Sequence, residues 1–267
     1  MRVTLVQIPL DWADPAANRA RIGQLLAPLA GATDLVVLPE AFTTGFDMQG
    51  GTGAERMGGA TCDWLLAQAQ RLDAAVLGSA FIRHEGGVSN RALWAAPDGT
   101  IAHYDKRHLF RMGGEHECYV AGREPLLVDW RGARIAPLVC YDLRFPVWSR
   151  RRERYDYDVL AYVANWPAAR HYAWQQLLRA RAIENQACVI GVNRVGADGH
   201  GVAHAGGSAA LDALGRPLVE LGDAPALETV MLDLGALREL RQRFPAALDA
   251  DAFTLAPTGG PVAWSQP

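Results

Sequence analysis

Three polar side chains of this sequence each stand at the end of an apolar run, where a strand would open into a loop. Glu40 closes DLVVLPE, Lys106 closes TIAHYDK and Cys140 closes RIAPLVC. A thiol becomes a useful nucleophile when a base accepts its proton and a positive charge lies nearby, because an unperturbed cysteine is mostly protonated at neutral pH. A carboxylate and an ammonium that converge on one thiol would supply both, at the strand ends where reactive groups of α/β sheets gather.

Each of the three residues also has an ordinary structural role. A cysteine in an apolar run is usually a buried small hydrophobe, and a lysine after a strand or a glutamate after a proline is usually solvated. Periodicity and spacing alone do not decide whether Glu40, Lys106 and Cys140 converge.

Other catalytic motifs are absent from the sequence. There is no GxSxG, GxxxxGK[ST] or HExxH pattern, and the Gly-rich segment at 50–59 lacks the preceding strand that a dinucleotide-binding loop needs. His116 and Cys118 are too close together and too isolated to suggest zinc. We therefore expect neither a metal nor a cofactor.

Composition excludes several classes of protein. Half of the 267 residues are apolar and the net charge is -3, which is typical of a soluble globular protein and argues against a nucleic-acid partner. The basic cluster RRRER at 150–154 is interpreted as a solvated helix face. Four scattered cysteines without a CxxC pair give no disulfide framework, and no run approaches the ~18 apolar residues of a membrane span. We expect a cytoplasmic protein that does not bind membranes.

Strand and helix patterns alternate along the whole chain. Strands are predicted over 2–8, 34–39, 74–84, 90–104 (a pair), 126–140 (a pair around Arg131-Gly132), 158–166, 188–196, 206–221 and 228–234. Helices are predicted over 14–30 with Asp14 as N-cap, over 61–72 with Thr61 as cap, near 146–154, over 171–186 and near 234–243. The mixture of hairpins and crossovers predicts a mixed-sheet α/β domain with at least two helix-covered sheet faces, rather than a TIM barrel.

The segments LVVLPEAFTTGF, YDKRHLF and LVCYDLRFP resemble, in this order, the three catalytic segments of the nitrilase superfamily of carbon–nitrogen hydrolases. The resemblance continues through 165–196 and 202–220, and so covers nearly the whole chain. It implies a four-layer α-β-β-α sandwich, and a single carbon–nitrogen hydrolase domain over 1–267 with an extended tail at about 255–267. It also implies a homo-oligomer of two or more subunits.

The resemblance assigns roles to individual residues. Cys140 would be the nucleophile, Glu40 its general base, and Lys106 with the backbone N–H of Tyr141 the oxyanion site. The family has a second glutamate ahead of a glycine, for which we prefer Glu115; Glu117 is its rival in the segment GEHECYVAG.

The overall resemblance is closest to the omega-amidase branch, which hydrolyses the terminal amide of 2-oxoglutaramate and 2-oxosuccinamate. Such a substrate needs a cation for its carboxylate, and the candidates are Arg144, Arg170 and Arg111. For Arg144 a local ion pair with Asp142 is the favoured alternative. The rings predicted to wall a small pocket are Phe42, Tyr119 and Trp166.

Other functions stay open from the sequence. A sibling amidase would act on N-carbamoyl compounds or deaminated glutathione, and a nitrilase would use the same nucleophile. A thiol redox or binding protein would explain Cys140 but not Glu40 or Lys106.

Overall fold

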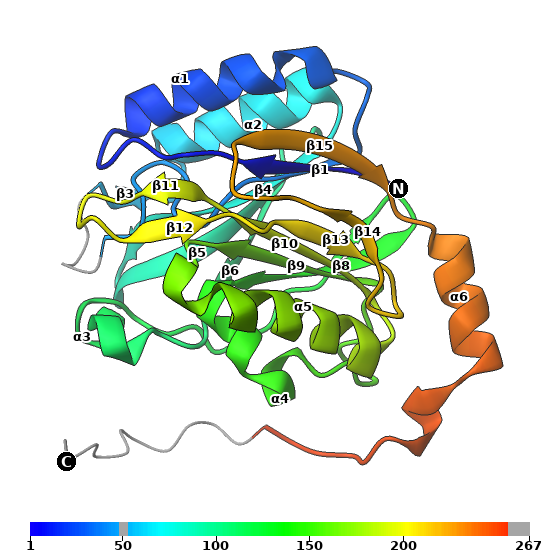
Figure 1. Cartoon of the computed structure of the whole chain (residues 1–267). Coiled ribbons are helices and arrows are strands. Elements are labelled where there is room, and N and C mark those ends of the chain that lie inside the picture. Colours follow the sequence, from blue (N-terminus) through cyan, green and yellow to red (C-terminus); the bar gives the residue numbers. More distant parts are fainter. Residues whose placement is uncertain (48–52, 256–267) are drawn as a thin grey trace, which may run out of the picture.

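The computed structural model describes residues 1–47 and 53–255, so the predicted C-terminal tail falls almost entirely outside the described residues. Two β-sheets lie face to face at the centre of the molecule, and helices cover the outer face of each (Figure 1). The predicted α-β-β-α sandwich with mixed sheets is confirmed.

The first sheet contains seven strands in the order β15-β1-β2-β4-β5-β6, with β3 paired to β4. Its parallel pairs are β1–β2, β2–β4 and β3–β4, and its other pairs are antiparallel. The strands are β1 (Arg2–Gln7), β2 (Leu35–Val37), β3 (Glu55–Arg56), β4 (Ala75–His84), β5 (Gly87–Ala95), β6 (Ile101–Asp105) and β15 (Ala226–Met231).

The second sheet contains six strands in the order β14-β13-β10-β9-β8-β7, of which β8, β9 and β10 are parallel. A separate hairpin, β11–β12, follows β10. The strands are β7 (Val128–Trp130), β8 (Ala133–Val139), β9 (Val159–Ala164), β10 (Cys188–Asn193), β11 (Val195–Ala197), β12 (Ala203–Ala205), β13 (Ala209–Leu211) and β14 (Pro217–Glu220).

Helices α1 and α2 cover the first sheet, and α5 covers the second (Figure 1). The α-helices are α1 (Pro15–Leu26), α2 (Ala60–Leu72), α3 (Glu115–Cys118), α4 (Pro146–Ser149), α5 (His171–Asn185) and α6 (Leu234–Arg243). The 3-10 turns are η1 (Ala27–Leu29), η2 (Arg111–Gly113), η3 (Cys140–Arg144), η4 (Ala168–Arg170) and η5 (Ala246–Asp249).

The unbroken apolar character of the central strands follows from this layering. In β1, Val3 and Leu5 belong to the apolar cluster between the two sheets, whereas Val6 belongs to the cluster beneath α1 and α2. Successive side chains of a strand point to opposite faces, so a strand covered on both faces is mainly apolar, and its buried polar side chains, such as Thr4 and Gln7, are hydrogen-bonded.

Two local predictions are wrong. The N-cap of α2 is Gly59 rather than Thr61, because the Glu55 carboxylate accepts hydrogen bonds from both the backbone N–H and the hydroxyl of Thr61. The basic cluster at 150–154 is not a helix face, since α4 ends at Ser149. Arg151 instead bonds Asp156 and the side chain of Asn185, which holds this segment against the end of α5.

The strands of both sheets deliver their carboxyl ends to one region. Strand β6 runs parallel to β2 because two antiparallel pairings separate β6 from β4, which is itself parallel to β2. Glu40, Lys106 and Cys140 follow β2, β6 and β8, and Asn165 follows β9 directly. Side chains far apart in the sequence therefore meet between the two sheets.

A carboxylate at the start of β2 links the two sheets. Asp34 accepts hydrogen bonds from Arg2 on β1, at 2.7 and 2.8 Å, and from Arg131 in the β7–β8 turn, at 2.6 Å. The hydrogen bonds from the Arg2 side chain, helped by its backbone N–H and by Arg131, hold the pKa of the Asp34 carboxyl well below its usual range.

We predict that Asp34→Asn lowers the free energy of unfolding by about 1–2 kcal/mol at pH 7. Because the folded-state pKa is depressed, this contribution exists above the unfolded pKa of about 3.9 and is lost as the pH falls towards the folded value. Urea unfolding at several pH values measures it, with the exposed Asp129→Asn as control. An Asp34→Asn deficit that does not shrink below about pH 4 would contradict the electrostatic origin.

Candidate active site

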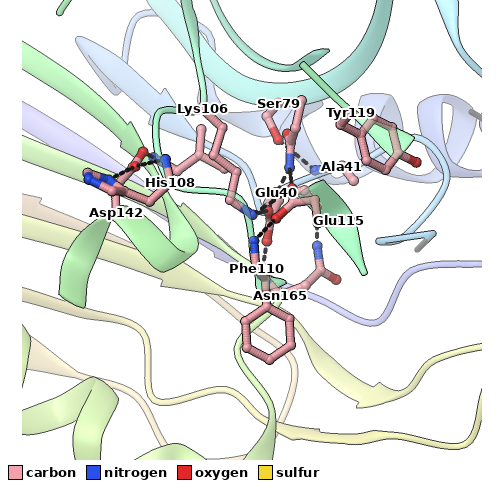
Figure 2. Close-up of polar contacts among 12 residues, drawn as sticks. Glu40, Ala41, Ser79, Lys106, His108, Phe110, Glu115, Tyr119, Asp142 and Asn165 are labelled. Atoms are coloured by element: carbon pink, nitrogen blue, oxygen red, sulfur yellow. Dashed lines mark hydrogen bonds and ion pairs between the residues drawn. The ribbon is translucent and has the colours of Figure 1, made fainter. Parts of the chain in front are cut away.

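Glu40 is buried and its carboxylate is held by three donors. Its Oε1 accepts hydrogen bonds from Asn90 Nδ2 at 2.7 Å and from Lys106 Nζ at 2.9 Å, and its Oε2 accepts one from the backbone N–H of Asn165 at 2.8 Å. Asn165 Nδ2 also donates to the Glu40 carbonyl oxygen at 2.5 Å. Glu40 is therefore fixed by residues from both sheets, as Figure 2 shows for Lys106 and Asn165.

Lys106 lies between two carboxylates. Its Nζ is 2.9 Å from Oε1 of Glu40 and 2.9 Å from Oε1 of Glu115, and all three side chains are almost completely buried (Figure 2). Burial opposes the charge on Lys106, but the carboxylates of Glu115 and Glu40 outweigh burial and raise the pKa of the ammonium above its ordinary value. Lys106 therefore stays protonated throughout the working pH range.

The structure distinguishes the two candidate glutamates of α3. Glu115 is fully buried, contacts Lys106, and accepts a hydrogen bond from the backbone N–H of Phe110 through Oε2. Glu117 is exposed on the opposite side of the same short helix. Burial raises the pKa of the Glu115 carboxyl, and Lys106 opposes that rise.

Cys140 is the first residue after β8 and has a φ of +43°, in the left-handed region that non-glycine residues rarely adopt. It is 8% exposed. Burial, followed by the negative charge of Glu40, raises the pKa of its thiol well above the ordinary value, while Lys106 acts in the opposite direction. The resting side chain is therefore a neutral thiol with a carboxylate beside it.

Asp142 organises the turn that carries Cys140. Its Oδ1 accepts from the backbone N–H of His108 at 2.9 Å and bonds His108 Nδ1 at 2.8 Å, and its Oδ2 accepts from Tyr104 Oη at 2.8 Å and from the backbone N–H of Val139 at 3.1 Å. The predicted ion pair with Arg144 is wrong, because the carboxylate of Asp142 is bonded instead to Tyr104 on β6, to His108 in the loop after β6 and to Val139 at the end of β8. Asp142 thus ties that loop to the Cys140 turn.

A small cavity, about 100 Å³ in volume, lies over Cys140. It is lined by Glu40, Phe46, Lys106, Phe110, Cys140, Tyr141, Arg144, Asn165, Trp166, Pro167, Arg170, Asp198, Val202 and His204. The cavity therefore combines the thiol, the buried ions and a surrounding wall of aromatic rings and basic groups.

Two of the three candidate arginines line this cavity. The Arg144 guanidinium lies over the Trp166 ring, 4.9 Å from its centroid, and that of Arg170 lies 5.2 Å from the centroid of Phe110. Within 1–47 and 53–255, neither guanidinium forms an ion pair. Arg111 is exposed and is not among the described residues that line the cavity.

The predicted aromatic walls are only partly brought together. Trp166 lines the cavity and donates its indole N–H to the carbonyl oxygen of Arg170 at 2.8 Å. Phe42 is instead fully buried in the cluster beneath α1 and α2, and Tyr119 stacks on Phe81 and donates its hydroxyl to the carbonyl oxygen of Asp47. Neither Phe42 nor Tyr119 is among the described residues that line the cavity.

Sequence reasoning missed several residues that hold Glu40 or line the cavity. Asn90 and Asn165 hold Glu40, and Phe46 and Phe110 line the cavity. Asn165 had a usable signal, since it ends a buried strand just as Glu40 and Cys140 do. Asn90 lies within β5 and carries no such signal.

In the part of the chain that the structure describes, no group of three or more His, Cys, Asp or Glu side chains is arranged to hold a metal ion. No helix within residues 1–47 and 53–255 has both the length and the apolar character of a membrane span.

Comparisons with known proteins identify the family of the chain. Residues 2–242 match the carbon-nitrogen hydrolase family. The chain is 51% identical over 257 residues to omega-amidase YafV of Yersinia enterocolitica, covering 96% of this chain and 98% of that protein. It is 32% identical over 246 residues to the 2-oxoglutaramate amidase of Bacillus subtilis, covering 91% and 95% of the two chains.

A solved structure is also closely similar. A CN-hydrolase superfamily protein of Xanthomonas campestris, which carries an arsenic adduct in its active site, is 53% identical and superposes with a TM-score of 0.94. The match covers 96% of this chain and 99% of that one. The chain therefore belongs to the carbon–nitrogen hydrolase family, in the omega-amidase branch of the nitrilase superfamily, and is an enzyme that hydrolyses carbon–nitrogen bonds other than peptide bonds.

Proposed function

We propose that this enzyme hydrolyses the terminal amide of small 2-oxo dicarboxylate monoamides, 2-oxoglutaramate and 2-oxosuccinamate, to the 2-oxo acid and ammonia. The observation that carries the proposal is one cavity that holds Glu40, Lys106 and Cys140 together with two arginines that form no ion pair with any described residue. The similarity to an omega-amidase and to a 2-oxoglutaramate amidase supports the same substrate class.

The first step is attack of Cys140 Sγ on the amide carbon. Because the resting thiol is neutral, the attack needs a base, and the Glu40 carboxylate beside it accepts the proton. Three donors fix Glu40, so little reorganisation is needed at the moment of transfer. Glu40 then gives the proton to the departing ammonia.

The oxyanion of the tetrahedral intermediate forms beside two donors. One is the ammonium of Lys106, which both carboxylates keep protonated. The other is the backbone N–H of Tyr141, in the first turn of η3, where N–H groups lack an intrahelical acceptor. Loss of ammonia leaves a thioester on Cys140, and Glu40 then activates the water that hydrolyses it.

The substrate's carboxylate binds to Arg144 and Arg170. Each guanidinium stacks on an aromatic ring, which orients its N–H groups without using them for an ion pair. Trp166, under Arg144, forms part of the same wall. This arrangement favours amides that carry a carboxylate at the far end over simple amides.

The enzyme is proposed to work in the cytoplasm. It is also proposed to form a homo-oligomer in which each subunit is a single domain. Helix α5 exposes Tyr172 and Ile183, which supports contact between subunits through this face. The net charge of -3 argues against nucleic acid as a partner.

Ammonia release from a panel of compounds tests the function. We expect rapid release from 2-oxoglutaramate and 2-oxosuccinamate, little from glutamine, an N-carbamoyl amino acid or butyramide, and none from a simple nitrile. Cys140→Ala abolishes release because no nucleophile remains, whereas Cys118→Ala, at an exposed cysteine, retains it. Turnover of another amide without turnover of either 2-oxo amide would contradict the substrate while keeping the chemistry.

We predict that Glu115→Gln lowers kcat by about 10²-fold, because Lys106 loses one of the two carboxylates that position its ammonium. The amide of Gln has a single acceptor oxygen, so its NH₂ must face either the Lys106 ammonium or the Phe110 N–H, both of which are donors. Glu117→Gln, exposed on the same helix, is the matched control and should keep kcat within about twofold. Equal rates for the two variants would remove Glu115 from the site.

A further inference from the structure

His204 is a buried residue that lines the cavity, and the proposed mechanism assigns it no role. It lies in β12, where it pairs with Gly196 of β11, and it is 6% exposed. It lines the same cavity as Cys140, and β12 packs against η4, the turn that ends at Arg170. His204 therefore borders the side of the cavity that carries a carboxylate-binding arginine.

The imidazole of His204 has unused hydrogen-bonding capacity. Its Nδ1 is buried and has no hydrogen-bond partner among the described residues. Such a group is rare in a folded protein unless a ligand or water satisfies it. Asp198, from the same hairpin, differs, because its Oδ1 already accepts from the backbone N–H groups of His200 and Val202.

The surroundings of His204 keep its ring uncharged. Burial, followed by the positive charge of Arg194, lowers the pKa of the imidazole, and Asp198 together with the nearby backbone of Val202 and Gly196 opposes this only in part. Arg194 is itself fully buried, and its NH2 group donates to the carbonyl oxygen of Ala197 at 2.9 Å, at the end of β11. A neutral ring suits a neutral oxygen, whereas Arg144 and Arg170 suit a carboxylate.

We propose that His204 is a specificity-determining residue, whose free Nδ1 hydrogen-bonds the 2-oxo group of the substrate or the hydroxyl of its hydrate. The 2-oxo group is bonded directly to the carboxylate carbon, so a substrate held by Arg170 presents that oxygen to β12. This inference rests on the proposed function and assigns to one side chain the selection of 2-oxo acids over their deoxy analogues.

The test compares two substrates that differ only at C2: 2-oxoglutaramate and glutaric acid monoamide. For the wild type we expect the larger kcat/KM on 2-oxoglutaramate. His204→Ala should lower that value about 10-fold to 100-fold and leave the value for glutaric acid monoamide within about threefold, because only the former loses a hydrogen bond. His204→Gln, which keeps a polar group at this position, should restore part of the preference.

His200→Ala is the matched control, since His200 lies on the same hairpin but is exposed. Near-ultraviolet circular dichroism and the thermal midpoint of every variant report whether the hairpin stays folded. A folded His204→Ala enzyme that loses activity equally on both substrates, or keeps the wild-type preference, would overturn the role of His204. A wild type that turns over the monoamide but not 2-oxoglutaramate would overturn the proposed substrate, and this inference with it.

Discussion

The active site depends on one buried cation shared by two buried carboxylates. Lys106 Nζ lies 2.9 Å from both Glu40 and Glu115, and each of these side chains is at most 1% exposed. Buried ions are tolerated only when they are paired and hydrogen-bonded, and removing one partner typically costs about 3–5 kcal/mol. Asn90, Asn165 and the Phe110 N–H supply the remaining donors, so the two sheets and the loop after β6 must pack together before the charges are satisfied.

The same constraint prepares the chemistry. Burial, followed by the negative charge of Glu40, raises the pKa of the Cys140 thiol, and in the proposed mechanism Glu40 also accepts the thiol proton. Lys106 carries the positive charge that an oxyanion needs. Asp142 connects the two halves of the site, since it binds the loop after β6 through His108 and the end of β8 through Val139. Its four hydrogen bonds explain why a polar residue is fully buried beside Cys140.

Much of the fold was predictable because the signals are local. Doubly buried strands are apolar at every position, as in LVV of β2, and Asp14 caps α1 as expected by accepting from the Ala17 N–H. The predictions failed where contacts with other segments of the chain determine the local structure. The N-cap of α2 is Gly59, and the Glu55 carboxylate accepts from the N–H of Thr61 in its first turn. The Arg151 contacts with Asp156 and Asn185 replace a helix with an irregular segment.

For the site, residue type and strand ends indicated Glu40, Lys106 and Cys140, but their convergence depends on the order of strands across two sheets. The choice between Glu115 and Glu117 depends on which face of a four-residue helix is buried. The local sequence does not reveal that face, because the two glutamates are only two positions apart. Phe42 was assigned to the cavity because aromatic residues near a catalytic segment often line it. Its ring instead packs against Trp64 of α2, on the far face of the first sheet.

In the proposed mechanism Cys140 carries the acyl group during turnover. Acid quenching of the enzyme during steady-state hydrolysis of 2-oxoglutaramate, followed by proteolysis and mass spectrometry, tests this directly. We expect a hydroxylamine-sensitive acyl adduct on the peptide that contains Cys140, and none in Cys140→Ala. Sustained turnover with Cys140 unmodified, or an adduct on a different residue, would contradict it.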